Sequence, residues 1–324
     1  MRMRKPIVSL LVFLSCLLIC TTVLPAQANN FVESWQLYEQ GKAKLADPDG
    51  PELGEALLAF QEAIDKRGSV FPEAEMAIGD IYFQEGAYAL AKRQYEKAFE
   101  LRKGMEIAEE KYTVLYRLAE LHEMQELYAD MDVYLRQVLR DQPYFADEQH
   151  SNYKNAFLST YDDKGLDHVF KLYRMEGVAF SVPAHAQLGW FYYRTGRPSA
   201  ILHGLFALDI MITESVTELR RVEPGFVYTT LDAFLDSALE RENIRRYLVS
   251  EEFFKTLYYL ATASYAASRP SLAEPIWRLL ATYPLSNVGP AATTYADLAV
   301  RQLETPWVDP YINPSVRRIE YPLQ

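Results

Sequence analysis

The sequence contains little cysteine, glycine or proline, and each scarcity excludes a class of protein. It has 2 Cys, 14 Gly and 17 Pro in 324 residues. Two cysteines cannot build a disulfide-rich scaffold, and so little Gly and Pro excludes a collagen-like or low-complexity chain. Positive charge is also scarce, with 33 Lys and Arg against 44 Asp and Glu, a net charge of -11. Such a balance argues against nucleic acid or anionic lipid headgroups as partners, because both are bound through Lys and Arg.

Sequence motifs of catalysis are missing as well. The chain has no G-x-S-x-G, no Gly-rich phosphate loop and no Rossmann fingerprint. Its five histidines are isolated, and His122-Glu123 lacks the second histidine that a zinc peptidase needs one turn later. Acidic pairs such as Glu109-Glu110 are typical of solvated helix faces. We therefore predict no catalytic, metal-binding or cofactor-binding residue and expect a protein that is not an enzyme.

The first 28 residues have the features of an export signal. Three basic residues near the start, Arg2, Arg4 and Lys5, precede an apolar run over residues 7–19. Small residues then flank a cleavage site at residues 26–28. Cleavage after Ala28 would start the mature chain at Asn29 and change the net charge from -11 to -14, because three basic residues are lost. The pattern predicts a periplasmic or secreted protein.

Two alternatives for the N-terminus remain open on sequence grounds. The apolar segment could stay uncleaved as an anchor, although polar Asn29 and Asn30 follow it directly. Residues 13–16 resemble a relaxed lipobox, so a lipid on Cys16, or on the less suitable Cys20, would attach the protein to the envelope. Once the signal is removed, membrane contact is expected only if Cys16 or Cys20 carries a lipid. After cleavage at Ala28 the mature chain would have no cysteine, hence no disulfide and no thiol nucleophile.

Nearly everything after Asn30 is predicted to be helical. Apolar residues recur at spacings of three and four, and strict alternation never extends beyond a few residues. Short Gly- or Pro-containing breaks separate the helices, at 47–51, 68–72, 142–143, 162–165, 196–198, 223–225, 269–270 and 284. A series of antiparallel helices with short turns forms either a bundle or a solenoid, and an internal repeat distinguishes the two.

An internal repeat is present. Residues 72–102 show it most completely, with Ile78, Gly79, Tyr82, Gly86, Ala91, Tyr95 and Ala98 at successive positions. Leu188-Gly189 with Tyr192 and Gly196 begins another copy, and Leu260-Ala261 with Ala273 and Trp277 a weaker one. The order of small, aromatic and turn residues resembles the tetratricopeptide pattern L-G-x2-Y…A-x3-F.

The resemblance to the tetratricopeptide repeat family extends over most of residues 31–286. After 72–102, it is closest in 31–67, 106–143 and 183–209, and weakest in 144–176 and 253–286. The chain departs from the pattern at His122, Met131 and Pro275. Residues 210–250 do not fit: one helix is expected to continue from Asp209 to Val222, and a single further helix to run from Val227 to Val249. This region would be an extra helical pair or a joint between two stacks.

The resemblance implies an all-α fold, a right-handed α-α superhelix of about five to six helix pairs with a capping helix over Pro290–Leu303. The expected organisation is a signal peptide (1–28), an N-terminal solenoid (31–222), further helical repeats with the cap (223–304) and an extended tail (305–324). Prolines forbid a continuous helix in the tail, and its aromatic residues make it too apolar for a simple linker. We expect the tail to dock on the protein surface or in the groove.

In this family the first helix of each pair lines a concave face, so the resemblance implies a set of groove residues. These partner-groove candidates are Trp35, Tyr38, Met76, Phe83, Tyr116, Tyr153, Trp190, Tyr193, Arg194, Lys255, Tyr258 and Tyr265.

The expected function is that of an exported, non-enzymatic scaffold that holds a partner protein or peptide in the groove, in envelope assembly, secretion or transport. Amphipathic aromatic side chains are suited to this role. The alternative is a periplasmic binder of a small molecule or lipid, with residues 210–250 capping a pocket. An enzyme with its active groups in the groove is the least favoured hypothesis.

Overall fold

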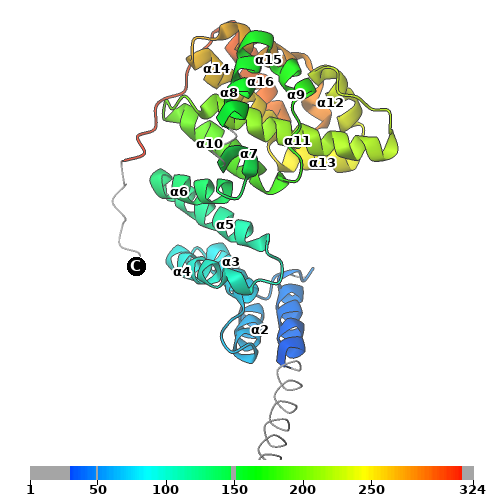
Figure 1. Ribbon diagram of the computed structural model, residues 1–324. Coiled ribbons are helices and arrows are strands. Elements are labelled where there is room, and N and C mark those ends of the chain that lie inside the picture. Colours follow the sequence, from blue (N-terminus) through cyan, green and yellow to red (C-terminus); the bar gives the residue numbers. More distant parts are fainter. Residues whose placement is uncertain (1–29, 49, 147–150, 316–324) are drawn as a thin grey trace, which may run out of the picture. The chain divides into compact units, whose positions relative to one another are not determined.

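The computed structural model describes residues 30–48, 50–146 and 151–315, and every regular element in these ranges is a helix (Figure 1). The all-α class predicted from the sequence is therefore confirmed. The chain divides into two compact units, residues 1–121 and residues 122–324. The predicted signal peptide, both cysteines and the last nine residues of the tail lie outside the described residues.

The first unit contains an unlabelled helix over residues 30–45 (dark blue in Figure 1) and the labelled helices that follow it. These are α2 (Leu53–Lys66), α3 (Pro72–Gln84), α4 (Tyr88–Glu100), the short 3-10 helix η1 (Arg102–Gly104) and α5 (Glu110–Met124), whose last residues belong to the second unit. Helix α3 begins with Pro72, followed by Glu73 and Glu75 in its first turn. A proline and acidic side chains at these positions suit the positive N-terminal end of a helix dipole.

The second unit begins with the end of α5 and contains the remaining helices. These are α6 (Tyr128–Leu139), α7 (Pro143–Ala146), α8 (Ser151–Lys164), α9 (Leu166–Leu172), η3 (Ala179–Ser181), α10 (Val182–Arg194), α11 (Ala200–Val222), α12 (Leu231–Leu239), α13 (Glu242–Ser250), α14 (Phe253–Ala266), α15 (Pro270–Thr282), η4 (Leu285–Asn287) and α16 (Pro290–Glu304). Helix α16 corresponds closely to the expected capping helix.

The division between the units differs from the expected boundary at residue 222. Helix α11 continues without a break to Val222 and packs against α12, α13 and α14, so residues on both sides of the expected boundary share one core. The single helix expected from Val227 to Val249 is also wrong, because α12 and α13 are separate helices. Thr230 caps α12 by accepting a hydrogen bond from the Ala233 N–H at 3.3 Å.

Glycines allow consecutive helices to cross closely. A Cβ on Gly79 of α3 would lie 2.6 Å from the ring of Tyr95 on α4. A Cβ on Gly41 would lie 2.5 Å from the ring of Phe60 on α2. In the pair formed by α10 and α11, a Cβ on Gly189 would lie 3.2 Å from the backbone nitrogen of Gly204. At the first two crossings, the space of a side chain on one helix is filled by an aromatic ring from the next.

Four helix-to-helix turns have the same conformation. In each, one residue has a positive φ, and the N–H of the following residue donates to a carbonyl five residues before it, which closes the C-terminal end of the first helix. The positive-φ residues are Gly86 (74°), Glu126 (56°), Gly196 (66°) and Ser268 (62°), and the bonds are Ala87 to Tyr82 (2.8 Å), Leu127 to His122 (2.7 Å), Arg197 to Tyr192 (2.7 Å) and Arg269 to Ser264 (2.9 Å). The repeat read in the sequence is thus accompanied by a repeated turn.

Helix α11 forms the core of the second unit. Its 23 residues are mostly buried, and it packs against α10 and α14. Among the described residues it is the one helix long and apolar enough to cross a membrane, and 89% of its most apolar window is buried inside the protein. A mostly buried core helix meets the same criteria of length and composition.

Candidate functional site

Residues 305–315, called here the tail strap, run as non-helical chain from the end of α16 across helix α10. Gln302, a fully buried side chain on α16, binds the first part of the strap. The Gln302 side-chain oxygen accepts the Trp307 N–H at 2.9 Å, and its amide nitrogen donates to the Trp307 carbonyl at 3.2 Å. Both backbone groups of Trp307 are therefore bound by one side chain.

The last two residues of α10 hold the next part of the strap. The Tyr193 hydroxyl accepts the Asp309 N–H at 2.7 Å and donates to the Asp309 carboxylate at 3.3 Å. Arg194 donates from Nε to the Pro310 carbonyl at 2.9 Å, and its own carbonyl accepts the Ile312 N–H at 2.8 Å. Most of these bonds go to the main chain of the strap, which is how proteins commonly hold an extended peptide.

Four tyrosines, Tyr193, Tyr258, Tyr259 and Tyr295, form a cluster beside the strap. Their ring centroids are 5.9 Å apart for Tyr193 and Tyr259, 5.3 Å for Tyr258 and Tyr259, and 5.6 Å for Tyr258 and Tyr295. Aromatic pairs at such distances attract each other. Burial raises the pKa of Tyr259 to about 12, with the negative charge of Asp309 adding to the effect. The pKa of Tyr193 is raised by the same causes, so both hydroxyls stay protonated near neutral pH.

Four of the predicted groove candidates meet at this site: Trp190, Tyr193, Arg194 and Tyr258. The Arg194 guanidinium lies 6.0 Å from the centre of the Trp190 ring. Tyr193 and Tyr258 are buried, while Trp190 and Arg194 are half-buried. The chain's own tail thus covers the part of the surface that the sequence assigned to a partner.

Four further residues of the site were missed by sequence reasoning. Tyr259 and Tyr295 lie outside the repeat pattern that guided the choice, and Gln302 belongs to the helix expected only to cap the solenoid. Asp309 is in the tail, whose docking was expected but without named contacts. A signal for Tyr259 was available in the Tyr258-Tyr259 pair, because neighbouring residues on a helix point about 100° apart and so face two neighbours.

The other candidates of the second unit pack between helices or pair locally. Tyr153 on α8 contacts Tyr173 at 5.3 Å between ring centroids, and Tyr265 contacts Trp277 of α15 at 5.5 Å. Lys255 forms an ion pair with Glu252 at 2.8 Å, one turn earlier. These three side chains are half-buried.

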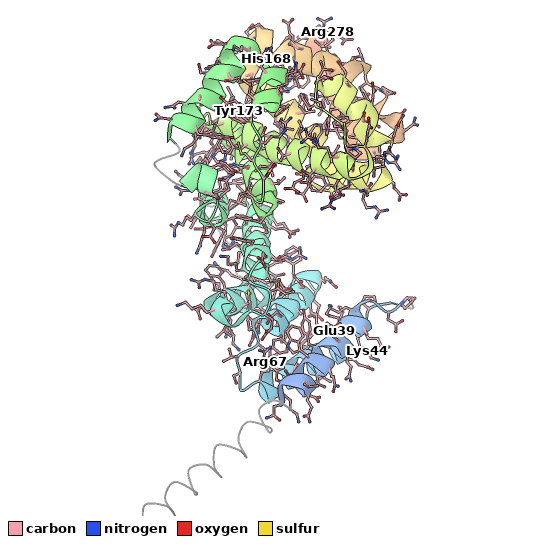
Figure 2. All side chains as sticks on the ribbon, turned by 45° about the vertical axis from the view of Figure 1, so that its right-hand side comes forward. Glu39, Lys44, Arg67, His168, Tyr173 and Arg278 are labelled. Atoms are coloured by element: carbon pink, nitrogen blue, oxygen red, sulfur yellow. The ribbon has the colours of Figure 1, made fainter. Side chains whose placement is uncertain are left out.

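The candidates of the first unit also pack against neighbouring helices. Tyr38 is buried, and its ring contacts those of Trp35 and Phe71 at 5.2 and 5.4 Å. The guanidinium of Arg67, labelled in Figure 2, lies 5.8 Å from the Trp35 ring. Phe83 contacts Tyr88 at 5.7 Å. The two remaining candidates in this unit are half-buried, Met76 and Tyr116.

Two pockets border the tyrosine cluster. One of about 230 Å³ is lined by Tyr193 together with Ile201, Ala263 and Ala266 from the ends of α10, α11 and α14. The other, of about 130 Å³, is lined by Tyr295 with Lys255 and by apolar side chains of α14 and α16. None of the lining residues of either pocket belongs to the tail strap.

A pocket of about 440 Å³ lies elsewhere in the second unit, where α9, α12 and α15 meet. Its lining includes Lys164, His168 and Lys171 as well as Asp167 and Asp232. His168 is exposed on α9, at the surface of the unit (Figure 2). The Asp167 carboxylate is already engaged, accepting hydrogen bonds from the Tyr228 hydroxyl at 2.9 Å and the Leu231 N–H at 2.8 Å. The lining is thus of mixed charge.

Three ionisable side chains are buried in the core of the second unit. The Nδ1 atoms of His185 and His203 lie 2.9 Å apart, and burial lowers both pKa values, that of His203 to about 3. Burial raises the pKa of Asp209 to about 7, although its carboxylate accepts the Met175 N–H at 3.1 Å. The pockets described above are not lined by His185, His203 or Asp209. Among the described residues there is no group of three or more His, Cys, Asp and Glu side chains that could hold a metal ion.

Comparison with known proteins gives two relatives and no matching family model. The chain is 27% identical over 220 residues to an uncharacterized protein of Treponema pallidum, which covers 67% of the chain and 58% of the relative. It is 25% identical over 283 residues to an uncharacterized protein of Borreliella burgdorferi, covering 79% of the chain and 87% of that relative. The chain therefore spans somewhat more than half the length of the Treponema protein and most of the Borreliella protein.

Proposed function

We propose that this protein is an exported, non-enzymatic scaffold built as a tetratricopeptide-like right-handed superhelix. The repeated helix crossings and the four matching turns support this fold. The spacing from the small residue to the bulky one is sixteen residues at Gly79 and Tyr95, Gly189 and Leu205, and Ala261 and Trp277. Each of these six residues is buried. Superhelices of this kind bind partners on extended surfaces.

The observation that carries the proposed function is that residues of α10 and α16 bind the tail strap through hydrogen bonds. The second unit already binds one extended segment through main-chain hydrogen bonds next to a cluster of tyrosines. Aromatic side chains and main-chain bonds supply affinity for peptides without a preformed secondary structure. The pockets beside Tyr193 and Tyr295 offer places for side chains of a bound segment. The ligand we propose is an extended segment of a partner protein.

Site-specific photocrosslinking in cells tests this function. A photoreactive residue at Ala266, in the 230 Å³ pocket, or at Lys255, in the 130 Å³ pocket, should capture the same protein, identified by mass spectrometry. The matched control is Ala233, an exposed position of α12 outside both pockets. Equal capture of the same proteins at Ala233 would contradict the proposal. The identified partner, once purified, should also bind the scaffold in solution.

A second candidate function, binding of a small polar solute, is favoured by the 440 Å³ pocket. Its volume falls within the range of ligand sites, and its charged lining suits a polar solute better than a lipid. Mass spectrometry of small molecules released from the purified protein checks this candidate. Substitution Lys171→Glu should change the retention of a charged solute bound there, weakening that of an anion, because it reverses the charge of a lining residue.

The export part of the proposal can be examined separately. Protein purified from envelope or medium should begin at Asn29 by N-terminal sequencing. A blocked N-terminus with the mass of a lipid on Cys16 or Cys20 would support the lipoprotein alternative instead. Retention of Met1 in a membrane-bound form would support the uncleaved anchor.

A further inference from the structure

We propose that the tail strap is a ligand in cis: it occupies the site at which the partner binds, and the partner segment resembles it. The predicted partner segment is extended and contains an Asp-Pro pair flanked by apolar residues, as in Val308-Asp309-Pro310-Tyr311. This inference rests on the proposed function and specifies the chemistry of its ligand.

The bonds that hold the strap select for backbone shape and for one acidic side chain. The N–H groups of Trp307, Asp309 and Ile312 and the carbonyls of Trp307 and Pro310 are bound by α10 and α16. Any extended chain carries such groups. The one strap side chain that the site recognises is Asp309. Its carboxylate accepts a hydrogen bond from the Tyr193 hydroxyl, and its negative charge raises the pKa of Tyr193, Tyr258 and Tyr259. The Asp309 carboxylate therefore lies at the edge of the tyrosine cluster, 3.3 Å from the Tyr193 hydroxyl.

The geometry of the strap agrees with a rigid, extended ligand. Pro306, Pro310 and Pro314 restrict its backbone to extended conformations. A segment that is already extended loses less conformational entropy when it binds.

The strap leaves much of its own apolar surface uncovered. Val308 is 51% exposed and Tyr311 is 67% exposed. A segment that served only to cover the core would be expected to bury such side chains, since burial of apolar area is the main source of stability. The strap half-buries Trp307 and Ile312 and is otherwise held by polar bonds, each of which contributes modestly to stability.

A partner can therefore outcompete the strap by adding apolar burial to the same main-chain bonds. The pocket of about 230 Å³ shares Tyr193 with the strap, and no strap residue lines it. An apolar side chain of a partner could enter there while the partner's Asp and Pro replace Asp309 and Pro310. Because a tethered segment has an effective concentration in the millimolar range, the strap weakens every competitor and sets a threshold for partner affinity.

The test uses the full chain with its strap released. The variant Asp309→Pro/Ile312→Pro removes two bound N–H groups and the Asp309 carboxylate. The matched control is Val308→Pro/Tyr311→Pro, which places two prolines at neighbouring strap positions whose N–H groups donate no hydrogen bond within the described residues. The probe is a fluorescent peptide with the sequence of residues 305–315, and its binding is followed by anisotropy.

We expect the released variant to bind this peptide at least tenfold more tightly than the wild type and the control variant do. A peptide with Asp309→Asn should bind the released variant more weakly, because an amide oxygen accepts the hydrogen bond from the Tyr193 hydroxyl less strongly than a carboxylate does. Equal affinity of wild type and released variant for the 305–315 peptide would overturn the inference.

Two further outcomes separate this inference from the proposed function. A wild-type dimer that the two prolines at 309 and 312 dissociate would overturn occupancy in cis, because the strap would then bind a second copy. Capture of one partner at Ala266 and Lys255 without any binding of the 305–315 peptide would leave the scaffold function standing and refute the inference. Peptide binding by the released variant without a crosslinked partner would show that the site takes an extended segment in trans, but it would refute the scaffold function and, with it, the assignment of this site to a partner.

Discussion

Substitution of Gly79 by alanine should destabilise the protein, opposite to the usual effect of this change in a helix. In an unhindered helix, Gly→Ala stabilises by about 1 kcal/mol. Here the new Cβ would lie 2.6 Å from two atoms of the Tyr95 ring. The ring cannot move away easily, because Tyr95 is fully buried and its hydroxyl donates to Asp80 at 2.7 Å. Asp80 is in turn paired with Arg117 at 3.0 Å.

The expected magnitude follows from two opposing contributions. Overpacking a well-filled core costs about 1–3 kcal/mol, and contact with two ring atoms of a fixed side chain places Gly79→Ala near the upper end. After subtraction of the helix-propensity gain of about 1 kcal/mol, the net loss is about 2 kcal/mol. The matched control is Gly54→Ala in α2, where a Cβ meets nothing within 4 Å. That control should gain up to about 1 kcal/mol.

Urea unfolding followed by circular dichroism measures both variants. With a slope of about 1–3 kcal/mol/M, the midpoints of Gly79→Ala and Gly54→Ala should differ by about 1 M or more. In a Tyr95→Leu background, which removes the ring, Gly79→Ala should turn neutral or stabilising, a coupling of about 2–3 kcal/mol between the two sites. Stabilisation by Gly79→Ala in the wild-type background would refute the assignment of this crossing.

Three further predictions concern the turn, the core and the strap. Ser268→Gly should stabilise and Gly86→Ala should destabilise, each by about 1 kcal/mol, because a positive φ strains residues with a Cβ; opposite signs in urea unfolding would refute this. The folded pKa of Asp209, about 7, exceeds the unfolded value of about 3.9, so the stability it contributes is complete below about pH 4 and is lost as the pH rises through about 7. The free energy of unfolding of Asp209→Asn should therefore rise relative to that of the wild type between pH 4 and pH 8. The gain reaches up to about 4 kcal/mol, at about 1.4 kcal/mol per pKa unit. A difference in unfolding free energy that does not change with pH would contradict this prediction. Gln302→Leu should leave the backbone of Trp307 unpaired and speed amide exchange there at least tenfold, and unchanged exchange would show that other contacts hold the strap.

Sequence patterns predicted the helices well because the repeat imposes local rules. Close crossing of helices requires a small residue at Gly79 and Gly189. A positive φ favours glycine at Gly86 and Gly196. Both requirements can be recognised in the sequence from the residue type. Glu126 and Ser268 adopt the same positive φ without glycine, so these two turns are marked in the sequence only by their place in the repeat.

The candidate site was less predictable because it depends on contacts between distant parts of the chain. The approach of Asp309 to Tyr193 joins residues far apart in the sequence, and no periodic pattern encodes it. Tyr258 has the pattern of a groove residue but is buried, and Gln302 and Tyr295 of α16 contact it. Helix phase predicts the direction of a side chain, whereas segments that are distant in the sequence decide whether that side chain meets solvent.

The polar side chains inside α11 have a consequence for the chain before it folds. If the protein is exported as proposed, a translocation pore meets this stretch of 23 mostly apolar residues as an unfolded chain, and the stretch is then a candidate for sideways release into the lipid. An aspartate at the middle of such a stretch costs about 2.5–3.5 kcal/mol in a bilayer, and Asp209 lies near the middle of α11. The Asp209 carboxyl thus destabilises the folded core near neutral pH but also opposes retention of this segment in a membrane. A hydrophobic residue at position 209 would stabilise the fold and at the same time favour insertion of the segment into the lipid during export.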